Sequence, residues 1–513
     1  MSKTVKEIVI VGGGTAGWLT AAIVACHHKT GTHSNIKITL VESSDIPTVG
    51  VGEGTWPTMK NTLREIGLKE ADVFKYCHAA FKQGGKFVDW VHGNGDFYYH
   101  PFTVPLGYGR IDLAPYVSNI EDYAIESNFQ HHVCEAGLAP RTMAEPEYSG
   151  QCNYAYHLDA GAFADLLKQH CKANLAVEHV IGTVQDTILD VHGNIESVAL
   201  SQSDYQELNH LSADLFVDCT GFASLLLGKA LGVPFVPKDD VLFNDSALAM
   251  HVPYEEESSP IACHTIATGQ NAGWIWDIGL PHRRGVGHVY SSQFLSDDQA
   301  EANLRKYLGG AGKDIAVRKI AFESGHRAQF WKKNCVAVGM SAGFVEPLEA
   351  TAIMLVEISA RYIAENLPVD NTLIDIVAKR FNQQMDYRWQ RIIDFLKLHY
   401  MLTKRPEPYW QAHLNPDSIP ESLQEDLALW RYRGPTPADF DSAIELFPAA
   451  SYQYVLYGMG FKPDFSKHAH LYNENLQAEK IIQRNQLLTE QMMSSLPGHR
   501  DYIDKWLLAA ARG

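Results

Sequence analysis

The stretch that decides the fold is GGGTAG at residues 12–17, which follows the apolar run EIVIV at residues 7–11. The apolar run predicts a short buried strand, and a helix is expected over residues 15–26. Glycines at these spacings permit a tight turn and let the backbone approach a pyrophosphate at the helix N-terminus. The stretch therefore predicts dinucleotide binding, and the alternative is a glycine-rich turn without a ligand. The residues of the predicted site are Gly12, Gly14, Thr15, Ala16 and Gly17.

A second strand is expected at residues 36–41, and Glu42 follows it directly. An acid at this place in a β-α-β unit hydrogen-bonds a ribose hydroxyl of the dinucleotide. Residues 214–221, DLFVDCTG, predict a buried strand that ends in a loop of small residues and lies beside the first strand. These features favour FAD as the dinucleotide. The sequence has no second glycine-rich nucleotide site for NADH.

The composition argues against two classes of binding partner, nucleic acids and anionic membranes. The chain has 513 residues, of which 46% are hydrophobic, and a formal net charge of -17. An acidic surface repels phosphate groups, so neither nucleic acid nor an anionic membrane is expected as a partner. No apolar run is long enough to span a bilayer.

The cysteines and histidines show no metal-binding pattern. The 8 cysteines are scattered without a CxxC pair, as in the reduced thiols of a cytoplasmic protein. The 23 histidines show neither HExxH nor a paired Cys/His spacing, so no metal site is expected.

The remaining segments predict an α/β fold class. Helices are expected at residues 58–76, 161–175, 352–366 and 373–400, a buried strand at 335–338, and strand-like alternation over 245–320. The expected architecture is an FAD-binding Rossmann-type body, like that of two-dinucleotide-binding-domain flavoproteins, with an interleaved mixed sheet. Residues 1–370 would form this body, including substrate-side strands and loops. Residues 371–513 would form a mainly helical region that packs on the body and helps to form the substrate site.

One motif points to a different enzyme class. GMSAG at residues 339–343 follows a strand and matches the nucleophile elbow of a hydrolase. Asp394 and His399 could complete the triad. A hydrolase, however, leaves the glycine pattern at residues 12–17 without a role, so a chance match is favoured.

Three further features carry candidate functional side chains, each with a simpler alternative. Lys82 is flanked by apolar and small residues, so it is either a buried reactive amine or, like most lysines, a solvated one. Trp274 and Trp276 place both rings on one face of a strand, where core packing is the simpler interpretation. Glu349 and Thr351 lie where the chain enters a helix, which is either an anion site on exposed N–H groups or plain helix capping.

Together these motifs resemble the flavin-dependent halogenases, the family typified by tryptophan halogenases. The resemblance covers residues 7 to about 410. It implies an enzyme that uses FADH2, oxygen and a halide to make hypohalous acid and to halogenate an electron-rich aromatic ring. The resemblance rests on GGGTAGW at residues 12–18, GVGEGTWP at 50–57, the lysine at 82, WIWDI at 274–278 and the glutamate at 349.

The resemblance also implies roles for individual residues. Lys82 would hold the hypohalous acid or become a haloamine, and Glu349 would orient the electrophile or take the proton from the ring. Trp274 and Trp276 would form a barrier between flavin and substrate. The other implied roles are FAD contacts by Gly52, Glu53, Gly339 and Leu348, halide contacts by Thr351 and Ala352, and substrate contacts by His100, Phe102 and Tyr454. A separate flavin reductase is expected to supply FADH2, while a homodimer and the choice between chloride and bromide stay open.

The chain departs from the family pattern in three places. The tryptophan motif continues as IGLP at residues 278–281 rather than Ile-Pro. The glutamate motif reads Ala350-Thr-Ala352 rather than Ser-Thr-Gly, and alanine at 352 still offers an N–H group but resists a positive φ. Residues 451–457 lack the tyrosine pair, glutamate and Phe-Trp that clamp free tryptophan, so an indole, a phenol or something larger is expected. The alternatives are a flavin-dependent aromatic monooxygenase and a non-catalytic FAD-binding sensor.

Overall fold

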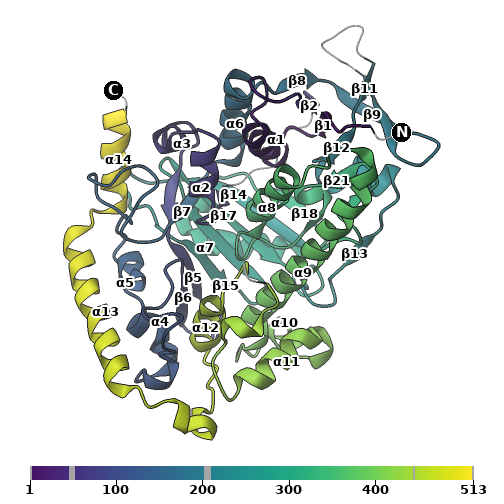
Figure 1. Cartoon of the computed structure of the whole chain (residues 1–513). Coiled ribbons are helices and arrows are strands. Elements are labelled where there is room, and N and C mark those ends of the chain that lie inside the picture. The colour runs from purple at the N-terminus through teal and green to yellow at the C-terminus, as the bar shows by residue number, and fades with distance from the viewer. Residues whose placement is uncertain (1–2, 46–51, 202–208, 443–444, 511–513) are drawn as a thin grey trace. The chain divides into compact units, whose positions relative to one another are not determined.

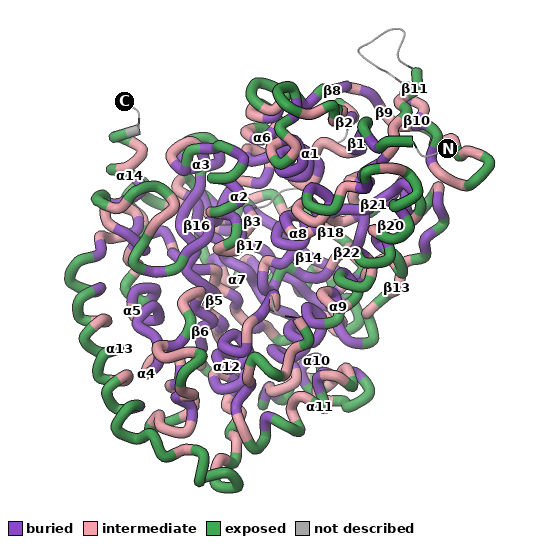
Figure 2. Tube along the Cα trace, viewed as in Figure 1, coloured by how far each residue is buried: buried purple, intermediate pink, exposed green. Residues whose placement is uncertain are grey.

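The computed structural model describes residues 3–45, 52–201, 209–442 and 445–510. Figure 1 shows the chain coloured by residue number. The chain forms two units, each assembled from three separate segments. Unit 1 comprises Met1–Ala79, Leu158–Lys238 and Glu323–Trp389, and unit 2 comprises Ala80–His157, Asp239–Phe322 and Gln390–Gly513. Buried residues follow the strands and the inner faces of the helices within each unit (Figure 2).

Unit 1 is built on a six-stranded sheet with the spatial order β20-β21-β12-β1-β2-β8. The strand β1 pairs in parallel with β2 on one side and with β12 on the other, so that Ile10 lies opposite both Leu40 and Val217. This pairing confirms the predicted β-α-β unit and the predicted place of the third strand beside the first. The strands of this sheet are β1 (Glu7–Val11), β2 (Lys37–Glu42), β8 (Glu178–Ile181), β12 (Leu215–Asp218), β20 (Trp331–Lys332) and β21 (Cys335–Ala337).

The helix α1 (Thr15–His28) lies at the centre of unit 1. It packs against both α6 (Ala160–Asn174) and α8 (Thr351–Glu365). Residues 17–25 of α1 are all buried, as expected for an apolar helix that is covered on all sides. Unit 1 also contains two smaller sheets and the short strand β3 (Glu53–Gly54). The smaller sheets are formed by β9 (Thr183–Leu189), β10 (Ile195–Ser201) and β11 (His210–Ser212), and by β13 (Phe235–Pro237), β19 (Gly325–Arg327) and β22 (Gly343–Phe344).

The helical stretch expected at residues 58–76 is divided in the structure. It forms α2 (Met59–Glu65) and α3 (Glu70–Tyr76), and Gly67 between them has a φ of 87°. A glycine in this left-handed conformation ends a helix, because the turn it makes cannot continue the helical hydrogen bonds. The prediction of one helix was therefore wrong at its middle, although both halves are helical.

Unit 2 is built on a seven-stranded sheet with the spatial order β18-β14-β17-β16-β15-β5-β6. Its described pairings are antiparallel except that of β15 with β5, which is parallel. A small antiparallel pair joins β4 to β7. The strands are β4 (Ala80–Lys82), β5 (Gly84–Val88), β6 (Phe97–Pro101), β7 (Ala155–Leu158), β14 (Ser246–Pro253), β15 (Thr265–Gly269), β16 (Trp274–Gly279), β17 (Arg283–Tyr290) and β18 (Arg318–Ala321).

One helix interrupts the strand-like stretch expected over residues 245–320. The helix α7 (Asp297–Leu308) begins with a capping box in which Ser296 and Gln299 satisfy each other's backbone N–H groups. It packs against β14 and β17 and covers a core formed by Leu248, Met250, Val252, Ile275, Val286, Tyr290, Ala300 and Leu304. The capping pattern was present in the sequence, so this helix could have been predicted.

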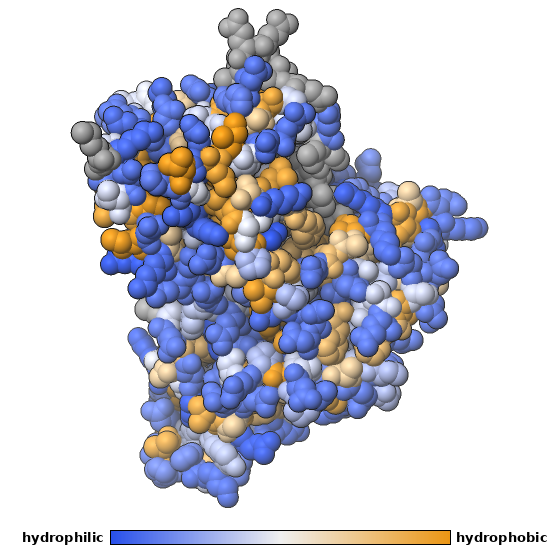
Figure 3. Space-filling model, turned by 90° about the vertical axis from the view of Figure 1, so that its right-hand side faces the viewer, coloured by the Kyte–Doolittle hydropathy of each residue, from blue (hydrophilic) through white to orange (hydrophobic). Residues whose placement is uncertain are grey.

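The C-terminal segments of the chain are mainly helical, as expected. The helix α9 (Ile374–Met401) begins in the last segment of unit 1 and ends in unit 2. Hydrophilic residues predominate on the face shown in Figure 3, with hydrophobic residues in small groups among them. Among the described residues, the longest helices are too polar to cross a membrane. The other helices of unit 2 are α4 (Tyr123–Ser127), α5 (Gln130–Glu135), α10 (Pro408–Ala412), α11 (Glu421–Trp430), α12 (Ala449–Gly458), α13 (Asn475–Ser495) and α14 (His499–Ala510).

Candidate functional site

The predicted dinucleotide turn in unit 1 is shaped by contacts that only glycine allows. Gly12 has a φ of 115°, in the region that side chains resist. A Cβ atom on Gly17 would lie 1.9 Å from the carbonyl oxygen of Gly12, so a larger residue cannot pack here. The glycines thus bring the start of α1 against the end of β1.

The N-terminus of α1 faces open space. A Cβ atom built on Gly14, the N-cap residue, meets nothing within 4 Å. The first turn of α1 carries no acidic side chain. The first N–H groups of a helix have no partner inside the helix and favour an anion. An uncrowded helix N-terminus without a competing carboxylate fits a pyrophosphate group.

Glu42, at the end of β2, uses its two carboxylate oxygens differently. Oε1 accepts hydrogen bonds from Nζ of Lys168 at 3.1 Å and from Nε2 of His179 at 2.8 Å. Oε2 faces the glycine turn, since a Cβ on Gly13 would lie 1.6 Å from it. Burial alone would raise the pKa of Glu42, but the hydrogen bonds from His179 and Lys168 outweigh it and hold the pKa below its usual value. An ionised carboxylate with one oxygen beside the turn suits a ribose hydroxyl.

The third strand and the 339–343 motif meet in unit 1. Gly339 has a φ of 73°, and a Cβ on it would lie 2.8 Å from the Cβ of Ala16 in α1. The buried hydroxyl of Ser341 donates to the carbonyl oxygens of Asp218 and Val338. A hydroxyl used to hold two backbone carbonyls is not arranged as a nucleophile beside a base. These contacts argue against a hydrolase elbow, and an FAD contact by Gly339 stays a prediction.

The other two members of the hydrolase alternative are also engaged elsewhere. Both lie in the unit 2 part of the chain, whereas Ser341 lies in unit 1. Nδ1 of His399 is 2.7 Å from the hydroxyl of Tyr98. The carboxylate of Asp394 accepts from Arg391 and from Ser422. These contacts argue against a hydrolase triad.

The loop predicted to contact FAD continues into Trp56. Residues 50 and 51 of its motif lie outside the described residues, while Gly52 is buried and Glu53 is partly buried. Burial, and next the charge of Asp159, raise the pKa of Glu53 to about 7. The indole N–H of Trp56 donates to the carbonyl oxygen of Glu349 at 2.8 Å. Trp56 thus ties this loop to the segment that carries the candidate glutamate, a function that the sequence pattern did not reveal.

The segment before α8 positions Glu349, which is buried, as is Leu348 beside it. Ala350 is the N-cap of α8 and has a φ of 55°. Thr351 and Ala352 are the first two residues of the helix. The left-handed residue of this segment is Ala350 and not Ala352, so the alanine at 352 is not strained by a positive φ.

The same segment bears on the two interpretations of the helix entry, an anion site and helix capping by Glu349 and Thr351. The N-cap residue itself, Ala350, makes no side-chain cap hydrogen bond. The N–H groups of Thr351 and Ala352 belong to the helix N-terminus, where an anion is favoured. The geometry is consistent with a halide at these two residues.

Lys82, in unit 2, is a buried lysine and not a solvated one. It ends β4, pairs with Ala155 of β7, and has a relative exposure of 4%. Its ammonium lies over the ring of Phe102, 5.2 Å from the ring centroid. The backbone N–H of Phe102 donates to the carbonyl of Gln83, which fixes this ring beside the lysine strand. A cation over an aromatic face in a buried place is stabilised by the ring and shielded from water.

The predicted substrate residues gather in the same unit. Nε2 of His100, at the end of β6, is 2.9 Å from the hydroxyl of Ser451 in α12. The hydroxyl of Tyr454, also in α12, donates to the carbonyl of Thr103 at 3.0 Å and accepts from Asn128 at 2.6 Å. The structure thus brings Lys82, His100, Phe102 and Tyr454 into one neighbourhood. Asn128 and Ser451 were not predicted, and the sequence around them carries no signal for this role.

The two tryptophans of β16 pack as a pair, as their spacing predicted. Their ring centroids are 6.4 Å apart, and both side chains are buried. Trp274 also lies 6.3 Å from Trp90. A Cβ on Gly287 of β17 would lie 2.2 Å from the ring of Trp276, so the neighbouring strand leaves room for it only because of this glycine. The rings are part of the core of unit 2, and a barrier role stays a prediction.

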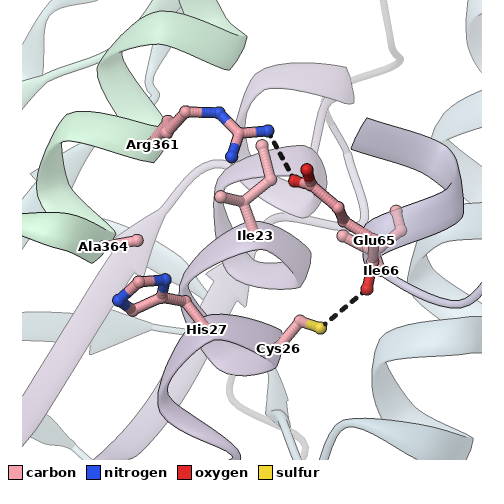
Figure 4. A pocket seen from close by; sticks show the side chains of 7 residues that line it. All are labelled: Ile23, Cys26, His27, Glu65, Ile66, Arg361 and Ala364. Atoms are coloured by element: carbon pink, nitrogen blue, oxygen red, sulfur yellow. Dashed lines mark hydrogen bonds and ion pairs between the residues drawn. The ribbon is translucent and has the colours of Figure 1, made fainter. Parts of the chain in front are cut away.

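A small cavity in unit 1 lies away from the predicted site residues. It opens between α1, α2 and α8 and is shown in Figure 4. Arg361 forms an ion pair with Glu65, with 2.7 Å between Nη2 and Oε2, and the thiol of Cys26 donates to the carbonyl of Glu65. None of the predicted site residues, all of which are described, lines this cavity.

Comparisons with known proteins point to one family. The family model described as tryptophan halogenase matches residues 7–474. The chain is 34% identical to the 7-chloro-L-tryptophan 6-halogenase KtzR of Kutzneria sp. (strain 744), over 97% of this chain and 98% of that protein.

Solved structures agree. A tryptophan halogenase from Shewanella frigidimarina matches with a TM-score of 0.94 and 44% identity, covering 99% of this chain and 98% of that one. BrvH, a flavin-dependent halogenase from Brevundimonas sp. BAL3, matches with a TM-score of 0.86 and 31% identity, covering 98% and 99% of the two chains. The similarity therefore extends over both units.

Proposed function

Because this chain belongs to the tryptophan halogenase family, it is a flavin-dependent halogenase, and we propose that it acts on an electron-rich aromatic other than free tryptophan. The proposed substrate class is an indole, a phenol or a larger molecule that carries such a ring. The cofactors are FAD in its reduced form and a halide ion.

The substrate proposal rests on the hydrogen bonds that the tyrosine hydroxyls of α12 make within unit 2. The hydroxyl of Tyr454 is hydrogen-bonded to Asn128 and Thr103, and the hydroxyl of Tyr452 accepts from Arg391 at 2.9 Å. Free tryptophan brings an ammonium and a carboxylate, and both need charged or strongly polar partners when they leave water. These buried tyrosines already have their partners inside unit 2. An uncharged ring therefore fits this region better than an amino acid.

The residues of unit 1 fit the cofactor. The glycine turn at 12–17 and the N-terminus of α1 would hold the pyrophosphate, and Oε2 of Glu42 would accept from a ribose hydroxyl. The N–H groups of Thr351 and Ala352 would hold the halide. Reduced FAD, when bound, supplies together with oxygen the oxidising power that converts halide to hypohalous acid.

Two side chains would then act on the electrophile and the substrate. The Lys82 ammonium, buried beside Phe102, would donate a hydrogen bond to the hypohalous acid. As a free amine it would instead take the halogen from the hypohalous acid to form a haloamine, with the O–halogen bond broken and water released. Glu349 would accept the proton that the ring loses on substitution, as a carboxylate acting as a general base. Water exclusion around Lys82 would limit loss of the electrophile by hydrolysis.

The source of reduced flavin is a separate protein in this proposal. Family members of this kind work with a flavin reductase, and this sequence carries a single glycine-rich dinucleotide motif. We place the enzyme in the cytoplasm, where reduced nicotinamide is available to such a reductase and where all 8 cysteines can stay reduced.

A reductase-coupled assay tests the proposal. The protein is supplied with FAD, a flavin reductase, NADH, oxygen and either chloride or bromide, and the products are identified by mass spectrometry. Substituted indoles and phenols should be halogenated with a higher kcat/KM than free tryptophan. A preference for free tryptophan would contradict the substrate proposal. Hydroxylated products that form equally well without halide would favour the monooxygenase alternative instead.

A further inference from the structure

Two thiols and an imidazole meet in the interior of unit 2, away from the residues assigned to halogenation. Cys134 lies near the end of α5, and Cys263 and His264 lie in a bend just before β15. One ligand atom of each lies within 4.8 Å of those of the other two, and all three residues are buried. We call these three residues the thiol–imidazole cluster. It could not be found from sequence spacing, because Cys134 and Cys263 are 129 positions apart.

The spacing of the cluster suits a tetrahedral ion. Nδ1 of His264 is 3.8 Å from Sγ of Cys263. Zinc binds thiolate sulfur at about 2.3 Å and imidazole nitrogen at about 2.0–2.1 Å, which places adjacent ligand atoms roughly 3.5–3.8 Å apart. The three side chains therefore need only a small contraction to share one ion, and a fourth position of the tetrahedron is left.

The charges of the cluster balance those of a divalent cation. Two thiolates and a neutral imidazole around Zn²⁺ give a site with no net charge, which is the condition for stable burial. Thiols bind zinc as thiolates, so uptake of the ion would release the protons of both thiols.

The surroundings of His264 orient its ring for binding. Its other nitrogen, Nε2, is 3.4 Å from the hydroxyl of Tyr99, and that hydroxyl in turn donates to the carboxylate of Glu135. Nζ of Lys86 lies 2.6 Å from the same carboxylate. If Nε2 carries the proton, the lone pair of Nδ1 points to the two thiols. Such a chain from imidazole to carboxylate is the usual support of a metal-binding histidine.

We propose that Cys134, Cys263 and His264 bind a zinc ion. The ion would join α5 to the bend before β15, two segments that are remote in the sequence. The carbonyl of Cys263 accepts a hydrogen bond from the backbone N–H of Gln83 at 2.7 Å. Because Gln83 directly follows Lys82, the ion would also stabilise the position of the strand that contains Lys82. The proposal is independent of the proposed substrate, because it concerns the stability of unit 2 and not the chemistry at Lys82.

The test measures metal in the full chain, purified without a histidine tag under reducing conditions with zinc present. Elemental analysis should find one zinc per chain. The variants Cys134→Ala and Cys263→Ala should lose it, whereas Cys171→Ala, a buried cysteine of unit 1, should keep it. A chelator should lower the melting temperature of the wild type and of Cys171→Ala, and should leave that of the two cluster variants unchanged.

Cobalt gives a readout that does not depend on the variants folding. Co²⁺ added to the metal-free wild type should produce thiolate-to-cobalt absorption bands, and zinc should remove them. The proposal is overturned if the wild type takes up neither metal or if Cys263→Ala retains zinc.

Discussion

The predicted cofactor site of unit 1 and the lysine neighbourhood of unit 2 are made from different parts of the chain. In unit 1 the key groups belong to the backbone: glycines without side chains, and the N–H groups at the starts of α1 and α8. Around Lys82 the key groups are side chains, contributed by β4, β6 and α12. A backbone site requires a few contiguous residues, whereas a side-chain site requires several segments to converge.

This difference predicts two kinds of mutational response. Substitutions at Lys82 should abolish halogenation and leave the stability of the fold and the binding of FAD unchanged. Substitutions in the glycine turn should damage packing and flavin binding together, because the same atoms serve both.

Lys82→Ala should lower the rate of halogenation by about 10²–10⁴-fold, the range typical for loss of a group that positions or transfers a proton. FAD affinity and melting temperature should stay close to those of the wild type. Lys86→Ala serves as the matched control, since Lys86 lies on the next strand and pairs with Glu135. Rates come from the reductase-coupled assay and affinities from flavin fluorescence. Halogenation by Lys82→Ala at the level of the control would remove the catalytic assignment.

Gly17→Ala should weaken FAD binding by about 100-fold, or roughly 2.7 kcal/mol. Its Cβ would lie 1.9 Å from the carbonyl oxygen of Gly12, so the turn must move and the melting temperature should fall as well. Gly14→Ala is the informative control, because a Cβ there meets nothing within 4 Å. It should leave the melting temperature of the FAD-free protein unchanged while reducing FAD affinity. Equal losses of melting temperature in the two FAD-free variants would show that Gly17 and Gly14 do not differ in their contribution to packing.

Glu53 should make unit 1 sensitive to pH. Its pKa in the folded chain is about 7, raised from 4.5 by burial and by Asp159. The folded state therefore holds a proton between these two values that the unfolded state has released, and the stabilisation is lost as the pH rises through 7. Between pH 5 and pH 8 the free energy of unfolding should lose about 2 kcal/mol from this group.

Glu53→Gln should remove that dependence, because an amide has no proton to lose. Urea unfolding of the FAD-free wild type and variant at pH 5 and pH 8 measures it. The variant should gain stability over the wild type at pH 8 and much less at pH 5. Unfolding curves that shift in parallel for the two proteins would show that Glu53 is not the group responsible.

Ala350→Gly should raise the free energy of unfolding by about 0.5–1 kcal/mol, since Ala350 has a φ of 55° and glycine adopts this conformation without strain. Ala352→Gly, two residues further on and inside α8, should lower it by a similar amount. Opposite signs at neighbouring alanines would place the left-handed residue at 350. Thermal or urea unfolding is sufficient to see the difference.

Most of unit 1 could be predicted because its decisive features are local. The strand at residues 7–11, the helix beginning at Thr15 and the acid at Glu42 are fixed by short-range patterns of apolar residues and glycines. The boundaries of α8 and α9 also lie within one residue of those expected. The positive φ of Ala350 was not predicted, because no local pattern marks an alanine for the left-handed conformation.

The side chains that surround Lys82 in unit 2 were harder to predict from the sequence. The residues that flank Lys82 left open whether it is buried, and only the family resemblance favoured a catalytic role for it. Asn128 and Ser451 hold Tyr454 and His100 across more than 300 positions of sequence, and no periodic pattern connects residues so far apart. The thiol–imidazole cluster was missed for the same reason.

The interleaving of the two units has a consequence for the newly made chain. In the sheet of unit 1, β12 lies between β1 and β21 (Cys335–Ala337), and it is enclosed only when β21, which is synthesised much later, pairs with it. At ordinary rates of translation, β12 must wait on the order of ten seconds for this partner. During that time the apolar edge of a half-built parallel sheet is exposed on the ribosome. We therefore expect expression of this protein to depend on chaperones that bind nascent chains, and on FAD only after synthesis has passed residue 389.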